Sequence, residues 1–99
     1  MIVIRNVFRL QFGKAKEAVP LIKELVAIQK KAGSTFPTRI LTDLTGPFYT
    51  INLEITAPGL GEFEREAPRI MGDKDFQNTY QKLTPLVESG YREIFTVVD

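Results

Sequence analysis

Two hydrophobic periodicities alternate along this chain, and their order limits the possible folds more than any other feature of the sequence. Residues 2–12 place apolar side chains at every second position, as in a β-strand. After Gly13, residues 14–32 show the spacing of three to four residues that is typical of an amphipathic helix. The strand pattern returns over residues 38–44 and 48–56, and the short Gly-containing connection between them predicts a β-hairpin.

The second half of the chain again gives helix before strand. Residues 62–71 predict a short helix, Asp73 can cap the start of another, and residues 91–98 predict a final strand. The second of these helices carries one apolar stripe of Phe76, Tyr80, Leu83 and Val87. Pro20 leaves two possibilities for the first helix, a kink or a regular part that begins near Val19.

The resulting order, β-α-β-β-α-β, predicts an α+β ferredoxin-like fold. Its four strands form an antiparallel sheet, and both crossovers are right-handed, which places the helices on one face. Ninety-nine residues with no linker or internal repeat make a single domain, residues 1–99. No apolar run approaches the roughly 20 residues that span a bilayer, and there are no cysteines, so we expect a cytoplasmic protein without a membrane partner.

Charge is unevenly distributed, but the two halves balance. Residues 1–40 hold eight Lys and Arg against two Asp and Glu, a net +6, whereas residues 41–99 hold five against ten, a net −5. Two glutamates interrupt the basic helix, and no RNA-binding motif accompanies it. We therefore expect the basic helix to lie beside the acidic region and not to bind nucleic acid.

The sheet face away from the helices has a mixed character. On the first strand, Ile2, Ile4, Phe8 and Leu10 suit the helix side, which leaves Val3, Arg5, Val7 and Arg9 on the other side, next to Phe48, Thr50, Asn52 and Glu54. Val7 and Phe48 would then be exposed in a monomer. A half-apolar face with charged residues around it is typical of a homodimer interface. The alternative is an ordinary wetted face with a few apolar side chains.

Several pieces of the sequence resemble a known family. They are the opening strand with its Gly13-Lys14 turn and charged helix, the D-x-x-F of Asp73 to Phe76, Pro85-Leu86-Val87, and Arg92-Glu93-Ile94. In this order the chain is similar to the NIPSNAP-like branch of the dimeric α/β barrel superfamily. The resemblance implies a ferredoxin-like protomer whose sheet packs on the sheet of a second copy. The superfamily includes cofactor-free oxygenases of aromatic polyketides, haem-degrading monooxygenases and lactone isomerases, so the fold alone does not choose a function.

Asn6 is the candidate functional residue on the first strand. It interrupts the apolar row that faces the helices, and a buried amide needs a hydrogen-bond partner. Haem-degrading members of the superfamily carry an Asn seven residues before a turn Gly, as Asn6 precedes Gly13. Their haem-ligating His and pocket Trp have no counterpart, because the chain contains neither residue, so no haem and no other cofactor is expected. The alternative role for Asn6 is a core amide bonded to a helix carbonyl or a buried water.

Tyr49 is expected near Asn6, because the two residues lie on adjacent strands of the predicted sheet and on its helix side. With Phe8, Phe76 and Tyr80, the pair would outline a mostly apolar pocket of the kind that binds small molecules. Tyr80 also has a simpler role as a core side chain with a wet tip.

Two functions follow, and the sequence leaves both open. The first is a cofactor-free oxygenase or isomerase, in which Asn6 holds a carbonyl or enolate oxygen and Tyr49 donates a second hydrogen bond. The proton acceptor would be Glu54, another carboxylate or the substrate itself. The second is a non-catalytic ligand-binding or structural homodimer. Without His or Cys, the usual catalytic nucleophiles and their activating base are missing, and no set of ligands for a metal ion is apparent.

Overall fold

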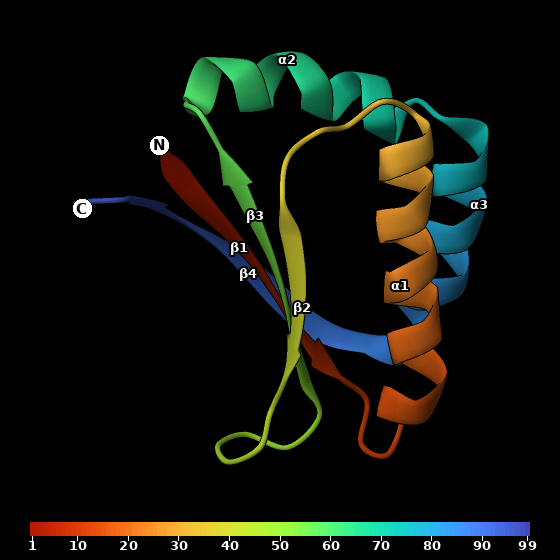
Figure 1. Ribbon diagram of the computed structural model, residues 1–99. Helices are drawn as coiled ribbons and strands as arrows, with labels where there is room; N and C mark the ends of the chain where they lie inside the picture. The colour runs from red at the N-terminus through yellow and green to blue at the C-terminus, as the bar shows by residue number, and fades with distance from the viewer.

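The computed structural model describes all residues, 1–99, and has four strands and three α-helices (Figure 1). Their order is β1 (Ile2–Leu10), α1 (Ala15–Lys31), β2 (Thr38–Thr42), β3 (Thr50–Ala57), α2 (Leu60–Met71), α3 (Lys74–Leu83), a 3-10 turn η1 (Thr84–Leu86) and β4 (Val87–Thr96). The strands form one antiparallel sheet in the order β2-β3-β1-β4. This topology confirms the predicted ferredoxin-like α+β fold.

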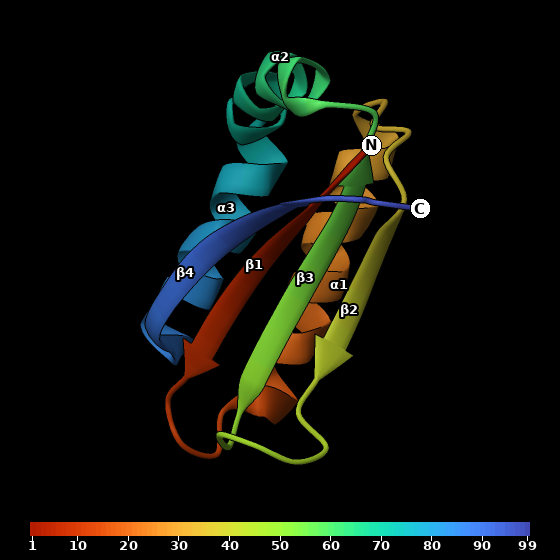
Figure 2. The same cartoon turned by 90° about the vertical axis from the view of Figure 1, so that its left-hand side faces the viewer.

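The helices all lie on one side of the sheet. Figure 2 shows the four strands in front and α1 and α3 behind them, with α2 above the end of the sheet. Two clusters of buried apolar side chains fill the space between these layers. One comprises Leu10, Ala18, Ile22, Leu25, Ile51 and Leu83, and the other Ile4, Leu53, Ile55 and Ala57. The alternation on β1 and β3 therefore points the predicted residues toward the helices.

Two prolines determine how the helices run and end. Pro20 lies inside α1, which begins at Ala15, so the regular helix does not start near Val19. Pro85 lies just beyond α3 and lacks an N–H, so the chain tightens into η1 and enters β4 at Val87. The prediction that Val87 belongs to the helix was wrong for this reason, and β4 begins four residues earlier than expected.

Gly90 lies within β4 where this strand runs close to β1. A Cβ on this residue would lie 3.0 Å from the backbone carbonyl oxygen of Val7, so a side chain here would push β4 and β1 apart by a few tenths of an ångström. The pairing of β4 with β1 runs from Ile2↔Thr96 to Leu10↔Val87, with a register shift between Arg9 and Leu10.

The uncovered sheet face differs from the prediction at two residues. Val7 is only 5% exposed, because Asn52 and Tyr91 flank it on the neighbouring strands. Phe48 is 70% exposed but lies in the β2–β3 loop, since β3 begins at Thr50. The expected exposure of Val7 in a monomer was therefore wrong, and Phe48 is not part of this face.

The packing between α3 and the sheet can be tested at Leu83, which is fully buried in the first cluster. We expect Leu83→Ala to lower the free energy of unfolding by about 2–5 kcal/mol, because it removes apolar contacts and leaves a cavity. Leu44→Ala, a matched change at an almost fully exposed loop residue, should alter it by less than about 0.5 kcal/mol. Urea titration of both variants measures the difference, and equal effects would contradict this account of the core.

Candidate functional site

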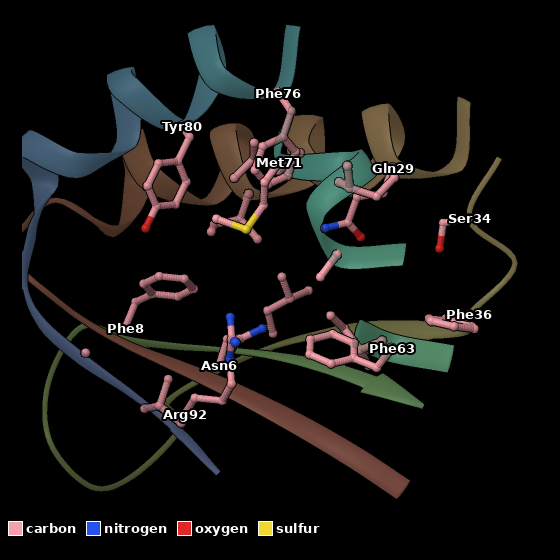
Figure 3. Close-up of a pocket in the computed structure, with 18 of the residues that line it drawn as sticks. Asn6, Phe8, Gln29, Ser34, Phe36, Phe63, Met71, Phe76, Tyr80 and Arg92 are labelled. Carbon is pink, nitrogen blue, oxygen red and sulfur yellow. The ribbon is translucent and has the colours of Figure 1, made fainter. Parts of the chain in front are cut away.

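A pocket of about 610 Å³ opens between the sheet and the helices. Of its 23 lining residues 15 are hydrophobic, and the lining comes from β1, β3, β4, all three α-helices and the loop between α1 and β2. Both its size and its apolar character are those of a small-molecule site. Figure 3 shows Asn6, Phe8 and Arg92 on the sheet side of the pocket, opposite Phe76 and Tyr80.

Asn6 and Arg92 form the polar centre of the sheet side. They are direct partners in the antiparallel pairing of β1 with β4, and their side chains emerge on the helix-facing side. The Arg92 Nε–H donates to the Asn6 Oδ1 at 2.6 Å. The guanidinium carbon also lies 5.6 Å from the centre of the Phe63 ring, within the range of a cation–π interaction. Arg92 is thus held from two directions.

The hydrogen bond between these residues also orients the amide. Its oxygen accepts from Arg92, while the Asn6 side-chain NH₂ donates no hydrogen bond within the chain. The Arg92 Nη groups likewise have no hydrogen-bond or ion-pair partner. Several donors on the sheet side of the pocket are therefore free to meet an oxygen atom of a ligand.

The opposite wall comes from α3. Asp73 caps this helix by accepting from the Phe76 backbone N–H at 3.0 Å, as the sequence predicted. Phe76 and Tyr80 are one helical turn apart, and their rings are stacked with centroids 6.1 Å apart. The Tyr80 hydroxyl points toward the sheet (Figure 3). The wall is therefore aromatic, with one hydroxyl directed into the pocket.

Arg92 is the only cationic residue on the pocket lining, and Glu66 of α2 is the only carboxylate there. No ion pair joins them. The pocket thus offers one fixed positive charge, one carboxylate and neutral polar groups in an apolar surrounding.

Four of the five predicted site residues line this pocket: Asn6, Phe8, Phe76 and Tyr80. Tyr49 does not. It precedes β3 and has a φ of 62°, so the strand alternation does not extend to it. Its carbonyl accepts from the Leu10 N–H, and its ring lies 4.7 Å from that of Phe12. Leu10 is four residues beyond Asn6 on β1. The hydrogen bond to Leu10 therefore places the Tyr49 backbone about 13 Å along the strand from Asn6.

Glu54 is also absent from the pocket. Its side chain emerges on the uncovered face of β3, where it accepts from Arg39 at 2.5 Å. Of the three proton acceptors considered, Glu54 is directed away from the cavity by the strand alternation, which leaves another carboxylate or the substrate itself.

Arg92, Phe63 and Glu66 are site residues that the sequence analysis missed. The signal for Arg92 was present, since Arg92, Ile94 and Thr96 alternate on β4 and the predicted topology places β4 beside β1. Only the register, which is not visible in the sequence, places Arg92 opposite Asn6.

The sequence matches no protein-family model and no curated protein. Solved structures match over nearly the whole chain. A NIPSNAP family protein from Agrobacterium tumefaciens is 22% identical with a TM-score of 0.87, and the match covers 99% of this chain and 93% of that one. A NIPSNAP domain protein from Burkholderia xenovorans is 15% identical with a TM-score of 0.87, covering 99% and 95%.

A third match is SnoaB from Streptomyces nogalater, a cofactor-independent oxygenase, which was solved as a mutant. It is 14% identical with a TM-score of 0.74, and the match covers 99% of this chain and 93% of that one. The chain thus has the ferredoxin-like fold that NIPSNAP family proteins share with this oxygenase. The resemblance predicted from the sequence is confirmed at the level of the fold.

None of the helices is long and apolar enough to cross a membrane. No group of three or more Asp or Glu side chains is arranged to hold a metal ion.

The role of Asn6 can be tested through stability. Asn6 bonds to a pocket side chain and to no backbone group, so we expect Asn6→Leu to leave the free energy of unfolding within about 1 kcal/mol of wild type or to raise it. Urea titration, with Asn78→Leu on the exposed surface of α3 as the matched control, measures the effect. A loss of more than about 2 kcal/mol would instead identify Asn6 as a structural core amide.

Proposed function

We propose that this chain is a cofactor-free enzyme, an oxygenase or isomerase, that acts on a small apolar or aromatic molecule held between sheet and helices. The observation that carries the proposal is the apolar pocket with the Asn6–Arg92 pair on one wall. The shared fold with a cofactor-independent oxygenase supports the same class. The absence of His and Cys from the sequence also supports it, because these are the usual ligands of haem and of transition metals.

In the proposed reaction, the chain's donors stabilise negative charge on the substrate. A carbonyl oxygen that becomes an enolate would lie against the Asn6 NH₂, which is free to donate. Fixed donors favour the charged state because they need no reorganisation when charge develops. Glu66, the only carboxylate on the lining, takes the place of Glu54 as the proposed proton acceptor.

We also propose that the chain works as a homodimer through the uncovered sheet face. Four charged residues, one from each strand, form a row of alternating sign across this face: Arg39, Glu54, Arg5 and Glu93. Within the chain these residues form two ion pairs. The nitrogen–oxygen distance is 2.5 Å between Arg39 and Glu54 and 2.7 Å between Arg5 and Glu93. A two-fold axis places the same row from a second copy opposite this one in reversed order. Each positive charge then faces a negative charge of the other copy.

Other features of the uncovered sheet face support the proposal that a second copy of the chain packs on it. Leu41, Tyr91 and Phe95 are exposed on it, and Phe95 keeps 49% of its surface open to solvent. The Arg9 Nε and the Asn52 Oδ1 are buried without a hydrogen-bond partner. Both atoms are already inaccessible within the single chain, so the support for a second sheet on this face comes from the exposed apolar side chains. We also propose that this homodimer is located in the cytoplasm.

Oxidation of dithranol in air tests the enzymatic proposal. In this reaction the ring CH₂ of a hydroxyanthrone becomes a carbonyl, and one O₂ supplies that oxygen and the oxygen of one water. Because Asn6 is proposed to hold the developing enolate, Asn6→Leu should slow quinone formation at least about tenfold relative to wild type. Asn78→Leu, outside the pocket, should match wild type.

Absorbance of the quinone in protein dialysed against a chelator, with a protein-free blank, measures the rate. A wild-type rate no higher than that of the blank would contradict the oxygenase proposal. If dithranol nevertheless bound, the non-catalytic ligand-binding homodimer would be the better description.

Sedimentation velocity at micromolar concentration tests the homodimer. We expect wild type at twice the 11.2 kDa mass of one chain. Phe95→Asp, which places an unpaired charge on the proposed interface, should sediment as a single chain. Leu44→Asp, the same change in an exposed loop residue, should leave the dimer intact. A single-chain wild type would contradict the proposal.

A further inference from the structure

We infer that the pocket takes a monocarboxylic acid with an apolar, ring-containing body, and that Arg92 binds its carboxylate. This inference rests on the proposed function, because it names the substrate class of the same pocket. It concerns the charge of the ligand and does not depend on which reaction follows.

The first argument is the state of the Arg92 guanidinium. It is the only cationic residue on the pocket lining, and no Asp or Glu pairs with it. Of the other charged residues of the sheet, Arg5, Arg39, Glu54 and Glu93 are paired within the chain, whereas Arg9 and Glu88 have no ion-pair partner and do not line the pocket. Arg92 is exposed to solvent at the sheet side of a mostly apolar pocket, and no carboxylate of the protein pairs with it there.

The second argument is that Arg92 is fixed before any ligand arrives. Its Nε is bound to the Asn6 Oδ1 at 2.6 Å, and its charged end lies 5.6 Å from the Phe63 ring centre. The two Nη groups remain, and together they form a planar fork that matches the two oxygens of a carboxylate. A fork that is already oriented loses little entropy on binding, which favours a charged ligand over a neutral one.

The third argument is the shape and lining of the remaining space. Phe8, Phe63, Phe76 and Tyr80 provide aromatic surface around Arg92, and Figure 3 shows them on both walls of the pocket. With about 610 Å³ available, a fused two-ring body fits beside the carboxylate with room to spare. The ligand that satisfies all three observations is an apolar aromatic acid.

Calorimetric titration with two matched probes, naphthoate and naphthamide, tests the inference at neutral pH. They share the ring body and differ in the charge of one group. We expect wild type to bind naphthoate at least about tenfold more tightly than naphthamide. In Arg92→Met, which keeps the unbranched apolar stem without the charge, naphthoate affinity should fall to that of naphthamide.

Naphthamide serves as the internal check on folding, because its affinity in Arg92→Met should change less than about threefold if the pocket is intact. Arg65→Met is the matched control. It removes the same charge from α2 at a residue outside the pocket, and it should keep the wild-type preference.

Three results would overturn the inference. Equal binding of both probes by wild type would do so and leave the proposed pocket standing. A preference that survives in Arg92→Met would assign the selectivity to another group. If neither probe bound to wild type, the proposed small-molecule function would fail together with this inference.

Discussion

The structure depends on the register of β1, a central strand that pairs along both of its edges. It is bonded to β3 on one side and to β4 on the other, so each of its side chains belongs to a row that crosses three strands. Side chains alternate along a strand, so one register decides the content of both faces at once. A shift of one residue would exchange the apolar rows for the charged ones. The hydrophobic rows between sheet and helices therefore fix the positions of all polar groups on the sheet.

This register places polar groups on both faces of the sheet, and both placements bear on function. On the helix side, Asn6 meets Arg92 within an apolar pocket. On the other side, Arg5 lies between Glu54 and Glu93, and the row of alternating charges results. The first arrangement gives a place for an oxygen-bearing ligand, and the second gives a surface that is complementary to a copy of itself. A single strand thus joins the ligand site to the proposed dimer interface.

Local patterns in the sequence were enough to predict the fold. Alternation on β1 and the cap at Asp73 are properties of short segments, and both persisted in the folded chain. The ends of segments were harder to predict. Val87 continues the helical stripe of α3 by spacing, but Pro85 stops the helix before it. Tyr49 continues the alternation of β3, but it lies in a loop with a positive φ. In each case backbone geometry at a boundary overrode the pattern.

The pocket was predicted in part for the same reason. Asn6, Phe8, Phe76 and Tyr80 stand out from their own periodicities, and they line the same cavity. Arg92 became recognisable as a site residue only through its pairing with Asn6 on the neighbouring strand. The sequence of either strand alone does not determine this pairing.

The most direct test of the Asn6–Arg92 centre is an NMR titration that follows the Arg92 Nε–H and the Asn6 side-chain amide as naphthoate is added. Substitution of either residue assigns the two signals. The account predicts that both move together and saturate at the same ligand concentration. If naphthoate bound while both signals stayed in place, the pair would not hold the ligand and the central claim would be wrong.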